Sequence, residues 1–418
     1  MPSTQPTACN SPVHLPWHVL PCQTIRRAGI LFLMLLVLLP ARAQMWDSLA
    51  TSDYRVDTAL TRTLRVEIDN LTFFRDNEYS STMSKGYSLP GLWIEPRLAY
   101  TPHRQIDLEA GLHASIFHGA NKYPNYVYHD MARWKGNQYQ RGAHALPWVR
   151  ARAQLKHLTI VLGDIYGGQN HRLVEPLFNA ETNLSQDPEA GMQLLWDRKR
   201  LHADTWINWQ SYIFEEDSHQ EAFTVGASWR IMPGDAGKPL RWHIPVQLVI
   251  HHRGGEQDTT SLGVQTLVNA ATGAGLTWTP CGGKALTRLC AEANILATYQ
   301  QSGHLWPFDS GMAFHASAGV TLWRSLMLRA GYFNAPKHFV SIYGNHFFST
   351  LSGRDGQSHD GIGTAYGHVE YSHVFARSYV LGAEAEVFQC HMPGRSETNF
   401  SFGLYLRVNP SIVIKRWG

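Results

Sequence analysis

The sequence predicts an all-β protein, a transmembrane antiparallel up-and-down β-barrel of about 16 strands (roughly 14–18). Three observations predict this fold. Segments of roughly ten residues alternate between apolar and polar side chains along residues 64–408. The segments come in pairs joined by short turns, and aromatic residues gather at both ends of the apolar face. In such a barrel the short turns are periplasmic and the long loops are external.

A secretory signal peptide precedes the first strand. Arg26 and Arg27 come before an apolar run, residues 30–39, and Ala41 and Ala43 form an A-x-A cleavage site. The run is about half the length that a helix needs to cross a bilayer, which is about 20 residues. Cleavage is therefore expected after Ala43.

This cleavage divides the chain into three parts. Residues 1–43 are the expected signal peptide, residues 44–62 a short periplasmic N-terminal segment, and residues 63–418 the transmembrane β-barrel. The leader holds three arginines and no acidic residue, so its removal lowers the formal charge from +3 to zero. A neutral chain without a basic cluster predicts no nucleic-acid partner.

The stretch RWHIPVQLVIHH, residues 241–252, illustrates the alternation. Trp242 and Ile244 share one face, and His243 and Gln247 share the other, because successive side chains of a strand point to opposite sides. The other expected strands are built on residues 64–68, 92–100, 106–116, 192–196, 203–209, 223–231, 268–278, 289–299, 312–322, 326–332, 369–371, 379–387 and 400–408, and a further pair of strands is expected within residues 149–162. The long external connections are expected at residues 71–90, 119–145, 167–189 and 334–363.

A soluble β-sandwich would also alternate, but two features argue against it. Trp196, Trp229 and Trp278 lie on the apolar face beside short turns, where a lipid-facing surface meets water. A sandwich would bury such residues near mid-strand. The opposite face is charged along many strands, which suits the interior of a closed barrel. The apolar face is therefore expected to meet lipid, and the polar face to meet a watery lumen.

The chain resembles porin-like outer-membrane β-barrel proteins of the Bacteroides group. The resemblance is carried by FFRDNEYS (73–80), QNHRLVEPLFN (169–179), DTWINWQS (204–211) and PVQLVIHHRGGEQD (245–258). It implies a Gram-negative cell outer membrane and a barrel without an assigned substrate, and it assigns no role to individual residues.

The connection at residues 167–189 is expected to fold into the barrel and narrow it. Its charged residues would then face charges on the strands, and opposed charges across a pore select polar solutes. The alternative is that these charges pair with one another in a plugged barrel. The residues expected to line the constriction are Glu95, Arg97, Arg150, Arg152, His171, Arg172 and Glu175.

Other site chemistry is weakly supported by the sequence. Cys281 and Cys290 flank a periplasmic turn and form either a disulfide or two free thiols. The histidines lack metal-site spacing, so no metal and no cofactor are expected. His315 and Ser317 share a strand face, but alternation places both inside, away from lipid. The sequence analysis therefore predicts that the protein is not an enzyme.

The expected function is a porin-like channel for passive diffusion of small polar solutes through the outer membrane. The alternative is a plugged barrel that anchors or assembles surface polysaccharide, with loop aromatics stacking on saccharides. These aromatics are Tyr123, Tyr126, Tyr128 and Trp134. Lipid of the outer membrane is an expected partner in both cases, and a homo-oligomer is left open.

Overall fold

The computed structural model describes residues 45–118, 142–214, 218–234, 237–255, 261, 263–352, 356–376 and 378–418. The expected signal peptide and the loop aromatics between Tyr123 and Trp134 lie outside these described residues. Within the described ranges, no helix is long and apolar enough to cross a membrane.

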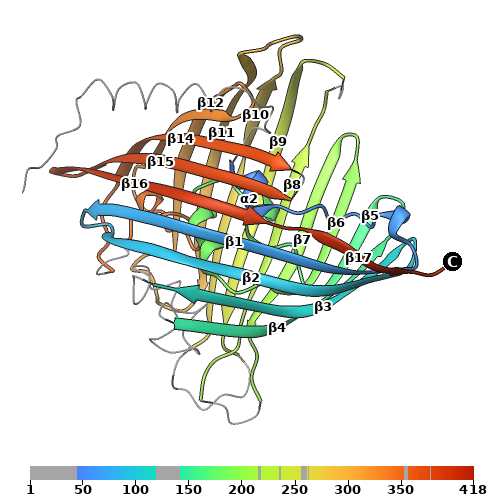
Figure 1. Ribbon diagram of the computed structural model, residues 1–418. Helices are drawn as coiled ribbons and strands as arrows, with labels where there is room; N and C mark the ends of the chain where they lie inside the picture. The colour runs from blue at the N-terminus through green and yellow to red at the C-terminus, as the bar shows by residue number, and fades with distance from the viewer. Residues whose placement is uncertain are drawn as a thin grey trace, which may run out of the picture. The chain divides into compact units, whose positions relative to one another are not determined.

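The described residues contain seventeen strands in one antiparallel sheet (Figure 1). The strands are β1 (Thr63–Ser80), β2 (Lys85–His103), β3 (Ile106–Phe117), β4 (Gly142–Gln154), β5 (Leu158–Asp164), β6 (Ala190–Arg198), β7 (Leu201–Ser211), β8 (Ala222–Ile231), β9 (Leu240–Arg253), β10 (Gln265–Trp278), β11 (Leu286–Ser302), β12 (Ser310–Leu322), β13 (Leu326–Ala335), β14 (Ile362–Ala376), β15 (Tyr379–Met392), β16 (Arg395–Val408) and β17 (Ser411–Arg416).

The sheet closes on itself because the last strands pair with the first. β16 pairs with β1 from Asn70 to Glu78, and β17 continues the line of β16 and pairs with β1 from Thr63 to Glu67. Every other strand pairs with its neighbours in sequence. Counted over the described residues, the result is a closed barrel with sixteen strand positions, which confirms the predicted fold.

The two faces of the wall differ as the alternation predicted. On β9, Trp242 is 55% exposed and Ile244 39%, whereas the side chains of His243 and Gln247 are buried on the other face. A closed barrel satisfies every backbone hydrogen bond internally, so its apolar exterior can face hydrocarbon. The protein is therefore an outer-membrane β-barrel with lipid around it, as expected.

One expected external loop is a hairpin instead. Residues 71–90 belong mostly to β1 and β2, which are joined by only four residues, 81–84. Leu71, Phe73 and Leu89 point inward and are buried there. The expected alternation fails at this place because apolar residues face the interior, where they pack against Met45 and Leu49.

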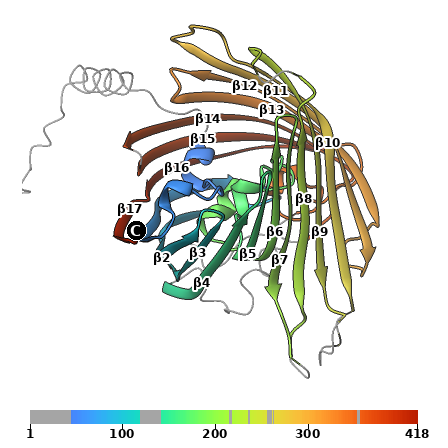
Figure 2. The same ribbon diagram turned by 90° about the vertical axis from the view of Figure 1, so that its right-hand side faces the viewer.

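The lumen is filled by segments that lie inside the ring of strands (Figure 2). They include helix α2 (Met45–Ala50) and the short 3-10 helices η3 (Gly168–His171), η4 (Ala180–Leu184) and η5 (His346–Phe348). A fourth 3-10 helix, η1 (Thr58–Leu60), precedes β1. The interior also contains an apolar core in which Phe333, Phe339 and Phe347 are fully buried. The lumen is thus partly apolar and not only watery.

Candidate functional site

The barrel wall has a notch on its external side, between β4 and β7. β4 pairs with β3 as far as Gly142, but it pairs with β5 only from Arg150 to Gln154. β5 already ends at Asp164, and β6 begins only at Ala190, whereas β7 continues to Ser211. Residues 143–149 of β4 therefore have no strand partner on this side among the described residues. We call this opening the lateral notch.

The base of the lateral notch is held by a polar corner. The Val149 backbone N–H donates to Asp164 Oδ2 at 2.5 Å, and Arg150 Nε donates to the Asp164 carbonyl at 2.5 Å. Pro147 stands two residues from Val149, so it faces the unpaired side of β4 and has no N–H to leave exposed. This is how natural edge strands limit unwanted pairing.

Two glycines allow the strands to meet at this corner. Gly163 of β5 pairs with Gly191 of β6, and both have positive φ angles, 88° and 154°. A Cβ at Gly163 would lie 2.1 Å from the Val149 carbonyl oxygen, and one at Gly191 would lie 2.2 Å from the Ile207 carbonyl oxygen. The short strands and the notch therefore depend on glycine at both positions.

A cavity of about 200 Å³ lies behind the lateral notch. Its wall combines apolar side chains with a few polar ones from β4, β7, β8, β9, the connection between β13 and β14, and the inserted loop, which we define as residues 165–189. We call it the upper chamber. The residues that line it include Leu146, His171, Phe178, Gln186, Asp187, Glu189, Trp206, Asn208, Trp209 and Tyr343.

His171 is a fixed cation at the floor of the upper chamber. Its Nδ1 lies 2.8 Å from Asp204 Oδ2, its Nε2 lies 3.2 Å from Glu189 Oε2, and its ring stacks on Trp206 at 3.5 Å. Burial alone would lower the pKa of His171, but the two carboxylates outweigh burial and raise its pKa to about 9. A protonated imidazole with both nitrogens engaged cannot serve as a general base.

A second imidazole lies in the lateral notch. His144 is on the unpaired part of β4, and its Nε2 lies 2.8 Å from Asp187 Oδ1 of the inserted loop. Both side chains are 17% exposed. A carboxylate that orients a partly exposed imidazole is the arrangement of a general base in hydrolytic enzymes. Strand parity places His144 on the same face as Arg150, which is the sequence signal that could have identified it.

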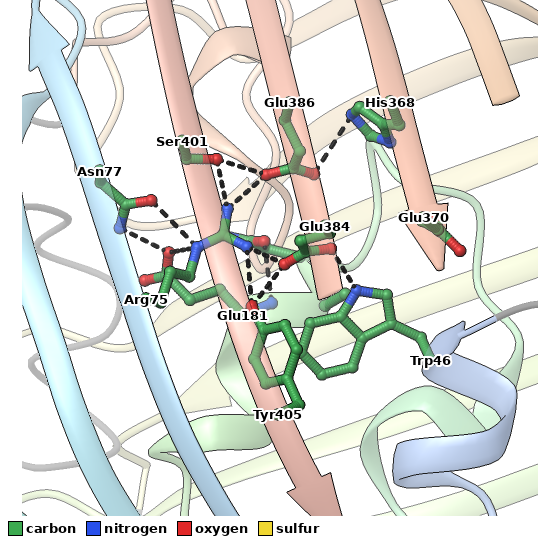
Figure 3. A network of polar contacts seen from close by, with 12 residues as sticks. Trp46, Arg75, Asn77, Glu181, His368, Glu370, Glu384, Glu386, Ser401 and Tyr405 are labelled. Carbon is green, nitrogen blue, oxygen red and sulfur yellow. Dashed lines mark hydrogen bonds and ion pairs between the residues drawn. The ribbon is translucent and has the colours of Figure 1, made fainter. Parts of the chain in front are cut away.

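The inserted loop is fixed to the wall by a buried polar network (Figure 3). Arg75 Nε lies 2.9 Å from Glu181 Oε2, and the same guanidinium group also pairs with Glu384 and Glu386 of β15. Trp46 of α2 donates from Nε1 to Glu384 at 3.0 Å. One arginine thus connects the inserted loop, the N-terminal helix and two wall strands.

The four wall residues predicted for the constriction lie together. Arg97 Nη1 is 2.8 Å from Glu95 Oε2, and both line a small cavity with Arg150. Arg152 lies beside them and pairs with Asp107 and, at 2.7 Å, with Glu109. Arg150 stacks on Trp148 and Tyr166 and donates to backbone carbonyls.

The three loop residues predicted for the constriction lie elsewhere. His171 is in the upper chamber, whereas Arg172 and Glu175 line a separate cavity. Glu175 Oε1 is 2.5 Å from Arg329 Nη2 and 3.4 Å from His368 Nδ1. No ion pair between described residues joins this loop set to the wall set, so a single constriction ring stays a prediction. Alternation gave no signal for Asp204 and Glu189 as partners of His171.

Of the two alternatives for Cys281 and Cys290, a disulfide or two free thiols, the structure has the free thiols. Cys281 is exposed in the turn between β10 and β11, Cys290 is half-buried on β11, and both are free thiols. His315 and Ser317 face the interior, as their parity predicted, and both line the cavity that contains Glu175.

Several solved structures resemble this chain in their backbone. Acinetobacter baumannii OccAB3 has 8% identity and a TM-score of 0.46, covering 84% of this chain and 99% of that one. The outer membrane protein OprD from Pseudomonas aeruginosa has 10% identity and a TM-score of 0.46, covering 86% and 98%. Pseudomonas aeruginosa OpdK, solved with vanillate, has 9% identity and a TM-score of 0.47, covering 84% and 99%. Likeness at this level carries no argument about function.

A search of curated proteins finds no match. A family model does match, and it corrects the sequence analysis. The model is described as lipid A 3'-O-deacylase-type and matches residues 56–417, which include all seventeen strands. The expectation that the protein is not an enzyme is therefore wrong, because the matching family is described by an enzymatic activity. The resemblance to the Bacteroides group in particular stays an expectation. With a match over residues 56–417, most of its 418 residues, this barrel belongs to the lipid A 3'-O-deacylase-type family.

Proposed function

We propose that the protein hydrolyses an ester-linked acyl chain of lipid A in the outer membrane. The observation that carries the proposal is the lateral notch, which interrupts the external part of the wall between β4 and β7. A lipid of the outer leaflet lies beside this part of the wall, so it can reach the interior sideways without leaving the membrane. The family description supplies the reaction class.

The chemistry assigns His144 as the base. With Asp187 orienting it, His144 removes a proton from water while the water oxygen attacks the acyl carbonyl carbon. The tetrahedral intermediate collapses with cleavage of the ester C–O bond, and the proton on His144 passes to the departing sugar oxygen. The products are a free fatty acid and a hydroxyl group on the lipid. Neither oxidant nor cofactor is needed for this balance.

The upper chamber would receive the reacting end of the acyl chain. Leu146, Phe178 and Trp209 supply apolar lining beside the notch, and Gln186 and Asn208 supply amide donors. The cation at His171 lies in the same chamber and would favour negative charge that develops on the carbonyl oxygen. A partly apolar pocket with a few polar groups suits an amphiphilic substrate.

The test is lipid A deacylation by the purified protein in detergent, followed by mass spectrometry of the lipid and of the released fatty acid. We expect His144→Ala and Asp187→Asn to lose roughly 10²–10⁴-fold in kcat, the usual contribution of a general base. His202→Ala is the matched control, because His202 Nδ1 lies 2.7 Å from Asp197 at the opposite end of the wall. This variant should keep its activity within about twofold.

Two outcomes would count against the proposal. If the wild-type protein leaves every lipid A ester intact, the proposed deacylase activity is contradicted. If His144→Ala is as active as His202→Ala, His144 is not the general base, although the protein is still a deacylase.

The porin-like channel is the second candidate function. It is favoured by a polar cavity of about 380 Å³ in the periplasmic half of the barrel, beneath the inserted loop. A channel would give conductance steps in a planar bilayer that fall as solute size rises. The alternative, a plugged barrel that anchors or assembles surface polysaccharide, would instead give a tight seal and bind saccharide chains.

A further inference from the structure

The polar cavity of about 380 Å³ borders the upper chamber, with which it shares Leu173 and Phe178, and it extends to Arg230 and Arg288 on the wall; we call it the lower chamber. Arg230 stands next to the last residue of β8, and Arg288 stands two residues after the start of β11. The end of β8 connects to β9, and the start of β11 connects to β10, by the shorter connections that lie on the periplasmic side of such barrels. The lower chamber therefore reaches into the periplasmic half. Arg172 reaches it from the inserted loop.

The arginines of the lower chamber differ from other arginines of the interior, of which Arg150 donates to backbone carbonyls. Six other interior arginines each form an ion pair with a carboxylate. They are Arg65, Arg75, Arg97, Arg152, Arg329 and Arg407. By contrast, the guanidinium groups of Arg172, Arg230 and Arg288 make no ion pair or hydrogen bond with any residue that the structure describes. The Nε of Arg288 is also buried without a hydrogen-bond partner.

The guanidinium group of Arg230 lies near enough to Arg172 and to Arg288 to be repelled by both positive charges. The nearby carboxylates of Asp47 and Glu292 attract Arg230 only at longer range. Glu292 is already engaged, because its Oε2 lies 2.6 Å from His243 Nε2 and its Oε1 accepts from Asn294 at 2.9 Å. Three guanidinium groups around one cavity therefore lack an anionic partner of their own.

We propose that the lower chamber binds an oxyanion of the phosphate type, held by Arg172, Arg230 and Arg288. Each guanidinium group presents several N–H donors in a planar fork that matches phosphate oxygens, and such charge-assisted hydrogen bonds are strong. The volume of about 380 Å³ exceeds what one phosphate fills, so the ligand is the phosphate group of a larger solute or of a lipid headgroup. The proposal does not depend on ester hydrolysis at the lateral notch.

Isothermal titration with inorganic phosphate, using the full-length mature barrel in detergent without phospholipid, tests the site. We expect saturable binding of one phosphate per barrel, weakened at least tenfold in Arg230→Gln and in Arg288→Gln. The matched control is Arg241→Gln, because Arg241 is an exposed arginine at the start of β9, on the same side of the barrel wall as the end of β8 that carries Arg230. Its affinity should equal that of the wild type. Competition by a soluble sugar phosphate and by a short-chain phospholipid then separates a periplasmic solute from a headgroup.

Absence of saturable phosphate binding to the wild type would overturn the proposal. Equal weakening in all three variants would also overturn it, because general charge would then explain the binding. If the arginine variants fail to fold, the wild type alone suffices. Soaking with tungstate should place its anomalous signal between the three guanidinium groups, and a signal only on the exterior would overturn the proposal.

Discussion

Arg75 on β1 and Glu181 in the inserted loop form an ion pair of 2.9 Å in which both side chains are almost completely inaccessible. The same guanidinium group pairs with two glutamates of β15, Glu384 and Glu386. This arrangement fixes the inserted loop inside the barrel, and with it the loop residues His171 and Asp187 of the candidate site. Stability of the interior and geometry of the site therefore depend on one buried cation.

Arg75→Ala should destabilise the barrel by about 3–5 kcal/mol, because it leaves three buried carboxylates without their cation. Chemical denaturation in detergent measures the loss. Arg55→Ala is the control, since Arg55 is 68% exposed and pairs with Asp197 at 3.5 Å. A surface pair of this kind contributes about 0–1 kcal/mol. Equal losses in the two variants would show that the buried network does not hold the inserted loop.

The wall of the barrel was predictable from sequence because its physical cause is local. Alternation has a period of two, so Trp242 and His243 must face opposite sides of the sheet. Because lipid surrounds the barrel, the apolar Trp242 faces outward and His243 faces the interior. The prediction failed at Leu71 and Phe73, where α2 and the inserted loop replace water in the lumen. There apolar residues face inward, so the alternation of an outward apolar face is lost and predicts a loop where the chain forms strands.

The candidate site was less predictable because it depends on distant partners. His144 becomes notable only because β5 ends at Asp164 and leaves β4 unpaired beyond Arg150, which is a property of register and not of any local pattern. Asp187 and His144 are 43 residues apart in sequence. His171 was singled out, but its partners Asp204 and Glu189 come from a strand and from the end of the loop.

Gly163→Ala should reduce stability more than the same change in an open turn. Gly394 has a similar positive φ, 75° against 88°, but a Cβ there would meet nothing within 4 Å. A Cβ at Gly163 would lie 2.1 Å from the Val149 carbonyl oxygen. The difference between Gly163→Ala and Gly394→Ala isolates this clash and should be roughly 1–3 kcal/mol in the free energy of unfolding. Equal effects would mean that the corner beside the lateral notch relaxes freely.

The free thiols should differ in reactivity according to their exposure. Cys281 is exposed and Cys390 is fully buried. A water-soluble maleimide should therefore label Cys281 in the folded barrel and Cys390 only after unfolding, as read by mass spectrometry of digests. Cys281→Ser should abolish the fast labelling. A non-reducing digest containing a peptide pair joined through Cys281 and Cys290 would contradict the free-thiol arrangement.

Raising the pH from 7 to 10 should loosen the inserted loop. The pKa of His171 is raised from an unfolded value near 6.5 to about 9, so its stabilisation is complete below pH 6.5 and is lost as the pH rises through about 9. A shift of this size corresponds to roughly 3 kcal/mol. Hydrogen exchange of the backbone around Gly168–His171 should accelerate over this range beyond the intrinsic effect of pH. In His171→Gln, which cannot titrate, the protection should already be reduced at pH 7 and should not fall further. A wild type whose protection is constant to pH 10 would mean that the two carboxylates do not hold His171 as a cation, and His171 would then become available as a base in the upper chamber.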